Sequence, residues 1–241
     1  MSNLNSVKTS WWSKPCRLSP SLICLDLCNL ERDVSELERA GIGQIHVDIL
    51  DGHFSPSMPL GLDTVRQLRA KTALPFECHV MTTANDYFVD ELLDIGVQQI
   101  VVHVETESHI DGMLKRIRAR GVRAGLALKP ATDLSTLSYV LDLCDSVLLM
   151  LINPGYASMA GEAQVGYAER KILDLRNMIT ERGLNTEIAI DGRISQADIM
   201  RFGASEVNSF VIGSTCLRRG ALRESLADLQ ALRRKVLEER V

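Results

Sequence analysis

The chain has 241 residues, of which 46% are hydrophobic and 24% are charged, and its formal net charge is −4. This balance predicts a globular protein with a sizeable core. Acidic and basic residues are interspersed, so no basic stripe of the kind that binds a nucleic-acid backbone is present. No apolar stretch has the length of a membrane span, and the N-terminus lacks a signal-peptide core. We therefore expect a cytoplasmic protein that binds neither nucleic acid nor membrane.

Short apolar runs alternate with amphipathic segments along the chain. The runs that predict strands are 17–25, 44–49, 75–80, 99–104, 123–128, 146–151, 186–191 and 209–213. The segments that predict helices are 30–41, 62–71, 85–96, 110–121, 134–144, 168–183, 195–203 and 222–240. Asn85, Asp133 and Ser195 stand where a polar side chain could cap the start of a helix.

The repeated order of strand and helix predicts a single-domain (β/α)8 TIM barrel over residues 17–241, after an N-terminal extension of residues 1–16. An open doubly wound sheet is the structural alternative. Such a sheet rarely needs eight regular units and usually has a glycine-rich turn after its first strand, whereas this chain continues into Leu-Cys-Asn-Leu at 27–30. The barrel is therefore the better interpretation.

Polar residues lie at or near the ends of three predicted strands: His46 and Asp48 in the second, His79 in the third and Asp191 in the seventh. Residues two apart on a strand share a face, and the carboxyl ends of barrel strands gather at one mouth. A single histidine there is more often structural than a ligand. Two buried carboxylates, however, would be costly without a cation, and a divalent metal ion would satisfy the whole set. Zinc, iron(II), cobalt and manganese all suit mixed nitrogen and oxygen ligands.

Several segments resemble the ribulose-phosphate 3-epimerase family. They are HVDILDGHFSP, ECHVM, LLMLINPG, IDG and VIGS, in this order and spacing, with PSLICLDL at the first strand. The resemblance extends from about residue 18 to residue 217. PSLICLDL, DGHF and CHVM are also similar to the D-allulose-6-phosphate 3-epimerase branch. The resemblance implies a metal-dependent isomerase of the pentose phosphate type, which inverts C3 of a phosphorylated ketose, as in the conversion of D-ribulose 5-phosphate to D-xylulose 5-phosphate.

The family pattern further implies residue roles. His46, Asp48, His79 and Asp191 would hold one divalent metal ion, with Zn²⁺ or Fe²⁺ favoured and Co²⁺ or Mn²⁺ as alternatives. Asp48 and Asp191 would also be the acid and the base, because inversion at C3 needs groups on opposite faces of a planar enediolate, which the metal ion stabilises. A family H-x-E motif matches His103 and Glu105, which would support the ligands. Together with a Trp11-Trp12 pair, the resemblance favours a homo-oligomer.

Positions around the predicted mouth match family residues that contact the substrate. They are Ser21, His79, Met81, Met150, Gly155, Tyr156, Ala157, Ser158, Gly192, Arg193, Gly213 and Ser214. Met81 and Met150 would cover the reacting centre and exclude water, although core methionines are the ordinary alternative. Leu50 stands where the family usually has methionine.

Two loops depart from the family pattern. The sixth reads GYASMAGE instead of GFGGQ, and the seventh reads Asp-Gly-Arg instead of Asp-Gly-Gly, so Ala157 and Ser158 gain β-carbons and Arg193 adds a cation. Either Arg193 donates to the substrate phosphate, or it points outward and the loops bind phosphate poorly. We expect retained epimerase chemistry on ribulose 5-phosphate, allulose 6-phosphate or another ketose phosphate.

Two other functions stay open at this level. One is a non-catalytic barrel that binds sugar phosphates, an interpretation that only the altered loops favour. The other is a metal-dependent aldolase that uses the same enediolate stabilisation. Exchange of the C3 proton with solvent and analysis of the products would separate the three functions.

Overall fold

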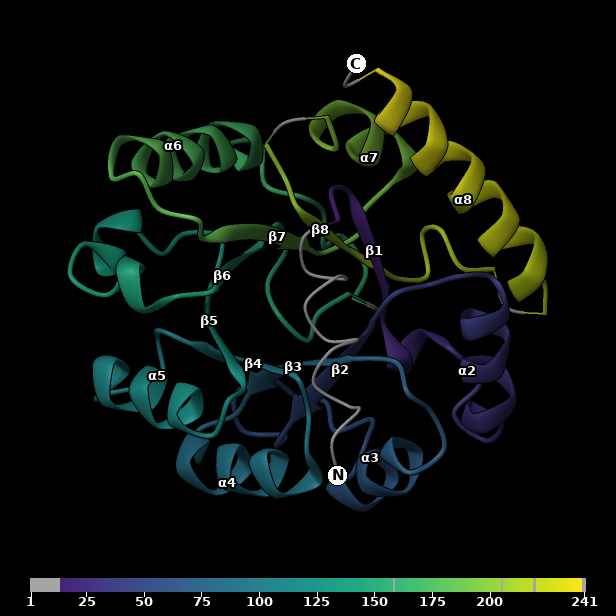
Figure 1. Ribbon diagram of the computed structural model, residues 1–241, viewed down its shortest axis with the longest axis horizontal. Helices are drawn as coiled ribbons and strands as arrows, with labels where there is room; N and C mark the ends of the chain where they lie inside the picture. Colours follow the sequence, from purple (N-terminus) through teal and green to yellow (C-terminus); the bar gives the residue numbers. More distant parts are fainter. Residues whose placement is uncertain (1–13, 158, 205, 219, 240–241) are drawn as a thin grey trace.

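The computed structural model describes residues 14–239 except 158, 205 and 219. Eight parallel strands form one sheet in the order β1-β8-β7-β6-β5-β4-β3-β2. An additional bridge between Ser21 and His46 joins the two ends of this order, so the sheet closes into a barrel (Figure 1). The strands are β1 (Arg17–Pro20), β2 (Ile45–Leu50), β3 (Phe76–Met81), β4 (Gln99–His103), β5 (Arg123–Leu128), β6 (Ser146–Met150), β7 (Glu187–Asp191) and β8 (Ser209–Ile212).

Helices surround the barrel on its outer side (Figure 1). They are α2 (Leu30–Arg39), α3 (Leu62–Arg69), α4 (Asn85–Ile95), α5 (Ile110–Ala119), α6 (Ala168–Glu181), α7 (Gln196–Phe202) and α8 (Leu222–Glu238). The predicted (β/α)8 barrel is confirmed. The separation of residues 1–16 as an extension stays a prediction, since residues 1–13, which include Trp11 and Trp12, lie outside the described residues. Within the described part of the chain, no helix is both long and apolar enough to span a membrane.

Two predicted elements differ from the structure. The segment 134–144 forms two short 3-10 helices, η2 (Leu134–Leu137) and η3 (Leu141–Leu143), rather than one α-helix. Asp133 accepts a bond from the Ser135 backbone N–H, and the Thr136 hydroxyl donates to the Asp133 carbonyl, so local side-chain bonds compete with the helical pattern. The first apolar run is strand only as far as Pro20, after which the chain turns into η1 (Leu22–Cys24).

The predicted caps give a mixed result. Ser195 and Asp198 form a reciprocal capping box at the start of α7, and Asp133 caps η2. The prediction for Asn85 is wrong, because this residue is the first of α4 and its buried amide donates to the carbonyl of Thr106. Its side chain therefore joins two loops at the carboxyl ends of β3 and β4 instead of capping a helix.

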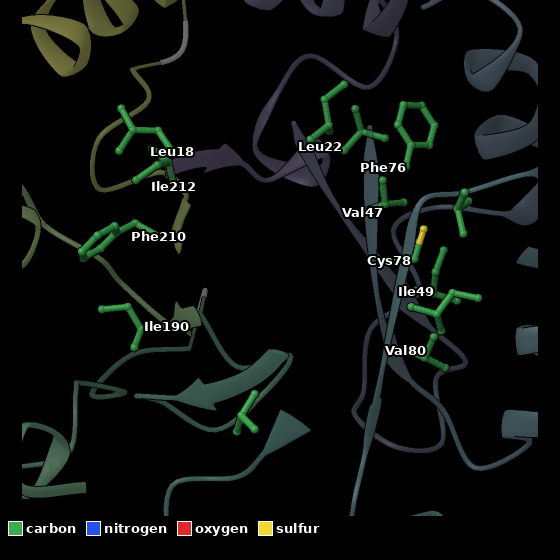
Figure 2. Packing of buried hydrophobic residues seen from close by; sticks show 14 of the residues in the cluster. Leu18, Leu22, Val47, Ile49, Phe76, Cys78, Val80, Ile190, Phe210 and Ile212 are labelled. Carbon is green, nitrogen blue, oxygen red and sulfur yellow. The ribbon is translucent and has the colours of Figure 1, made fainter. Parts of the chain in front are cut away.

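Side chains alternate between two apolar regions. Val47, Ile49, Cys78 and Val80 pack outward in the large core between barrel and helices, as Figure 2 shows. The inward-facing positions hold a much smaller cluster, made of Val101, Ala127, Leu148, Met150, Ala189 and Val211. Packed side chains therefore fill the interior of the barrel, and the polar groups at the carboxyl ends of the strands lie at one mouth of it.

Candidate metal centre

His46 and Asp48 on β2, His79 on β3 and Asp191 on β7 converge at the mouth of the barrel. One ligand atom from each lies within 4.8 Å of all the others. His46 Nε2 is 3.3 Å from Asp48 Oδ1 and 3.9 Å from Asp191 Oδ2. His79 Nδ1 is 3.6 Å and 3.8 Å from the same two oxygens. These separations are close to the ~3.4 Å expected between ligands placed tetrahedrally about 2.1 Å from one ion. We call these four residues the ring.

The two inward-facing nitrogens of the ring are suited to a cation. His46 Nε2 and His79 Nδ1 are fully buried and have no hydrogen-bond partner among the described residues. A buried polar atom without a partner costs about 1–3 kcal/mol, and two of them aimed at one point require an explanation. A divalent cation would accept both lone pairs and would neutralise the two carboxylates. The ring residues therefore fit a metal ion.

The electrostatics of the ring favour positive charge. Burial acts to raise the pKa of Asp48, but the neighbouring imidazole of His46, and to a smaller extent that of His79, outweighs it and holds the pKa well below its ordinary value. At Asp191, burial and the nearby Asp48 prevail over His46 and raise the pKa to about 7. Burial lowers the pKa of His79 to about 4, so its imidazole is neutral and keeps a lone pair for a metal ion.

A buried glutamate contacts His46 on the side of the imidazole that faces away from the ring. His46 Nδ1 is 2.9 Å from Glu77 Oε1, and Gln44 Nε2 donates to the other carboxylate oxygen at 3.3 Å. A proton on Nδ1, donated to Glu77, leaves the lone pair of Nε2 facing the ring. The sequence interpretation missed Glu77. Its position two residues before His79, on the same strand face, is the signal that could have identified it.

His79 is supported through a second imidazole. His79 Nε2 is 2.9 Å from His103 Nε2, and His103 Nδ1 is 2.8 Å from Glu105 Oε2. If His79 binds a cation through Nδ1, its proton is on Nε2 and is donated to His103, which then carries its own proton on Nδ1 and donates to Glu105. Burial acts to raise the pKa of Glu105, but hydrogen bonds from His103 and Thr132 lower it to about 2. The carboxylate is therefore an acceptor at neutral pH.

A cavity of about 270 Å³ opens above the ring. Of the predicted substrate contacts, its lining includes Ser21, Met81, Met150, Gly155, Ala157, Gly192, Arg193, Gly213 and Ser214. His79 is fully buried beneath it, Tyr156 does not line it, and Ser158 lies outside the described residues. The sequence interpretation missed the lining residues Ile23, Cys24, Ser57, Ile152, Val211, Thr215 and Leu217. Most follow a strand end closely, which is the signal that a barrel provides for them.

A larger groove of about 840 Å³ lies beside this cavity, between the starts of α2 and α8. Its arginines are each in an ion pair: Arg32 with Asp33, Arg218 with Asp228 and Arg223 with Glu36. The groove thus combines charges that already satisfy one another, unlike the two unpartnered nitrogens of the ring.

Comparisons with known proteins agree with this geometry. The model of the ribulose-phosphate 3 epimerase family matches residues 17–217. The chain belongs to this family. It is 33% identical over 219 residues to a chloroplastic ribulose-5-phosphate-3-epimerase from Arabidopsis thaliana, a match that covers 90% of this chain and 77% of the relative. It is 37% identical over 177 residues to a ribulose-phosphate 3-epimerase from Treponema pallidum, covering 73% of this chain and 80% of the relative.

Solved structures support the fold of this epimerase family member. A 3-keto-L-gulonate-6-phosphate decarboxylase from Vibrio cholerae aligns with a TM-score of 0.65 at 12% identity, covering 92% of this chain and 99% of that chain. The tryptophan synthase alpha subunit from Legionella pneumophila aligns with a TM-score of 0.62 at 13% identity, covering 99% of each. At such low identity these likenesses show a shared barrel alone.

Two glycines of this epimerase-family chain bring backbone close to neighbouring groups at the cavity. Gly155 has a φ of 83°, and a β-carbon there would lie 2.1 Å from Ser55 Oγ. Gly192 has a φ of 114°, and a β-carbon would lie 2.9 Å from the backbone nitrogen of Ile152. A larger residue at either position would move the wall of the cavity.

Arg193 has a placement that neither sequence-based account described. Its Nη2 donates to the carbonyl of Ala157 at 2.9 Å and to that of Met159 at 3.4 Å. The residue also lines the cavity, with a φ of 51°. The guanidinium therefore joins the loop after β7 to the loop after β6.

Proposed function

We propose that this protein is a metal-dependent 3-epimerase that interconverts D-ribulose 5-phosphate and D-xylulose 5-phosphate. The observation that carries the proposal is the ring, in which two carboxylates and two unpartnered imidazole nitrogens face one point beneath a small cavity. The family match supports the reaction class, and the names of the relatives make ribulose 5-phosphate the first substrate to test.

The ring residues have two tasks in this proposal. His46, Asp48, His79 and Asp191 would hold the metal ion, which when bound supplies Lewis-acid stabilisation of negative charge on the substrate oxygens. Asp48 and Asp191 would move the proton: one carboxylate removes it from C3, and the other returns a proton to the opposite face of the planar intermediate. Since the reaction is reversible, each serves as base in one direction and as acid in the other. Zn²⁺ and Fe²⁺ are the first candidates, followed by Co²⁺ and Mn²⁺.

Neighbouring side chains would prepare this proton transfer. The Ser21 hydroxyl donates to Asp48 Oδ2 at 2.6 Å, which orients the carboxylate and leaves Oδ1 toward the ring. Met81 and Met150, both buried and both lining the cavity, would exclude water from the reacting carbon. Leu50 also lines the cavity.

The remaining predicted contacts would surround the substrate tail. They are Gly155, Tyr156, Ala157, Ser158, Gly192, Arg193, Gly213 and Ser214. We also propose a cytoplasmic homo-oligomer whose barrel begins at residue 17, with the Trp11-Trp12 pair in an extension that contacts the barrel or a partner subunit. Sedimentation of the full chain and of a chain lacking residues 1–16 would test the oligomer and the boundary together.

Solvent exchange tests the activity. Metal-loaded protein in D₂O should incorporate deuterium at C3 of ribulose 5-phosphate and produce xylulose 5-phosphate, and a chelator should remove both effects. D-Allulose 6-phosphate is the second substrate to assay, because part of the sequence resembles that branch. If ketose phosphates bind to metal-loaded protein without any exchange, the chain is a binding barrel. Cleavage of a carbon–carbon bond would instead identify an aldolase.

A further inference from the structure

Two neighbouring loops line one side of the cavity, and each donates hydrogen bonds to the other. We call residues 151–167, between β6 and α6, the sixth loop, and residues 192–195, between β7 and α7, the seventh loop. The sixth loop is closed at its base, where the Val165 N–H donates to the Leu151 carbonyl at 2.9 Å. Within it, the Asn153 N–H donates to the Glu162 carboxylate at 2.7 Å. Bonds within the sixth loop therefore hold its two ends together, independently of the seventh loop.

Each loop donates to backbone carbonyls of the other. Arg193 in the seventh loop donates to the carbonyls of Ala157 and Met159, as described above. In return, Gln164 Nε2 in the sixth loop is 3.0 Å from the Gly192 carbonyl and 3.2 Å from that of Arg193. The same amide nitrogen is 3.2 Å from Asp198 Oδ2, and Asp198 is the partner of Ser195 in the capping box of α7. These bonds connect the sixth loop to the start of a helix.

Three of the five acceptors of these bonds belong to residues of the cavity wall. Ala157, Gly192 and Arg193 all line the cavity, whereas Gln164 does not. The bonds thus set the distance between two walls of a cavity of only about 270 Å³, at or below the small end of ordinary ligand sites. A shift of either loop would change the space for the substrate without moving the ring.

The backbone of Arg193 has an unfavourable conformation that contacts of its side chain offset. Among the described residues other than glycine, only Cys16 and Arg193 have a positive φ. An L-residue in this region costs of order 1 kcal/mol, and such strain persists when the surrounding contacts offset it. The bonds to the two carbonyls of the sixth loop are the contacts that offset it here.

We propose that Arg193 and Gln164 form a clamp that holds the sixth and seventh loops at the spacing the substrate tail requires. Arg193 is then a positioning residue, not a direct phosphate ligand. The substrate side of this inference rests on the proposed epimerase function. The clamp itself exists in the free protein and can be measured there.

The test compares an arginine that lines the cavity with a glutamine that does not. Arg193→Met removes the donors and leaves the strained backbone, Arg193→Gly also relieves the strain, and Gln164→Ala removes the bonds from the opposite side. Arg201→Met is the matched control, because Arg201 pairs with Glu169 between α6 and α7 and does not line the cavity. Each clamp variant should accelerate amide hydrogen exchange in the sixth loop of the free protein by about fivefold, the effect of about 1 kcal/mol for one hydrogen bond.

Steady-state kinetics with ribulose 5-phosphate completes the test. Both Arg193→Met and Gln164→Ala should raise KM about fivefold with kcat within about twofold, because they weaken binding without touching the ring. If Arg193→Met raises KM while Gln164→Ala leaves KM and loop exchange unchanged, Arg193 contacts the phosphate directly and the clamp is wrong. Unchanged loop exchange in all three variants also refutes it. If wild-type protein does not act on ribulose 5-phosphate, loop exchange still decides the clamp, so the two failures are distinguishable.

Discussion

The ring and the two loops that border the same cavity are constructed differently. Ring side chains come from three strands, and even the most accessible of them, that of Asp191, is only 18% exposed. Strand pairing places them, since Asp48 lies directly opposite His79 in the register of β2 and β3. In the loops, Arg193 and Ala157 are exposed, and a few bonds to carbonyls set their positions. The difference teaches that the geometry of the reacting groups depends on the sheet. The fit of the substrate depends on loop contacts that can change without moving the sheet.

The largest effect should come from the carboxylates of the ring. Asp191→Asn and Asp48→Asn each remove a group that carries a proton, so C3 exchange should fall by about 10³-fold or more. The variants should retain the circular dichroism of the wild type. Asp111→Asn, at an exposed position on α5, is the control and should not affect exchange. Wild-type turnover in either ring variant would remove that carboxylate from the proposed mechanism.

Glu77 tests whether a residue outside the ring contributes to metal binding. Glu77→Gln keeps the shape of the side chain but removes the charge that holds the proton on His46 Nδ1. Metal affinity should fall by about 100-fold, toward the upper end for residues that orient a ligand from outside. Competition with a chromophoric chelator measures this without reference to activity. An unchanged affinity would mean that β2 alone orients His46.

Glu105 should have a smaller effect, because it acts on His79 only through His103. For Glu105→Gln we expect metal affinity to fall by about tenfold, near the lower end of the same range. The two glutamates are matched controls for each other in one chelator titration. A larger loss for Glu105→Gln than for Glu77→Gln would contradict the order expected from one direct contact to a ring histidine and one contact through His103.

The strands and the ring residues on them could be predicted from the sequence, whereas the contacts between the loops could not. Alternation within short apolar runs located the strands, and residues two apart gave the shared face of His46 and Asp48. Glu77 is on the same pattern and was missed only because its partner, His46, lies on another strand. Residues 134–144 were predicted as one α-helix, because the spacing of apolar residues does not reveal the local side-chain hydrogen bonds that favour two 3-10 helices. The bonds of Arg193 could not be predicted, because a flexible side chain in a loop reaches whichever acceptor the neighbouring loop presents.

The smallest effect should come from the sixth loop at Ala157, where the family usually has glycine. Ala157→Gly leaves the carbonyl that accepts from Arg193, so the clamp persists. The added backbone freedom costs about 0.5–1 kcal/mol in an ordered loop. We expect KM for ribulose 5-phosphate to rise about twofold with kcat and metal affinity unchanged. Because the loop and the ring are held by separate contacts, a loss of kcat in this variant would show that the loop helps to place the reacting carbon over the carboxylates, and the division between chemistry and fit would then fail.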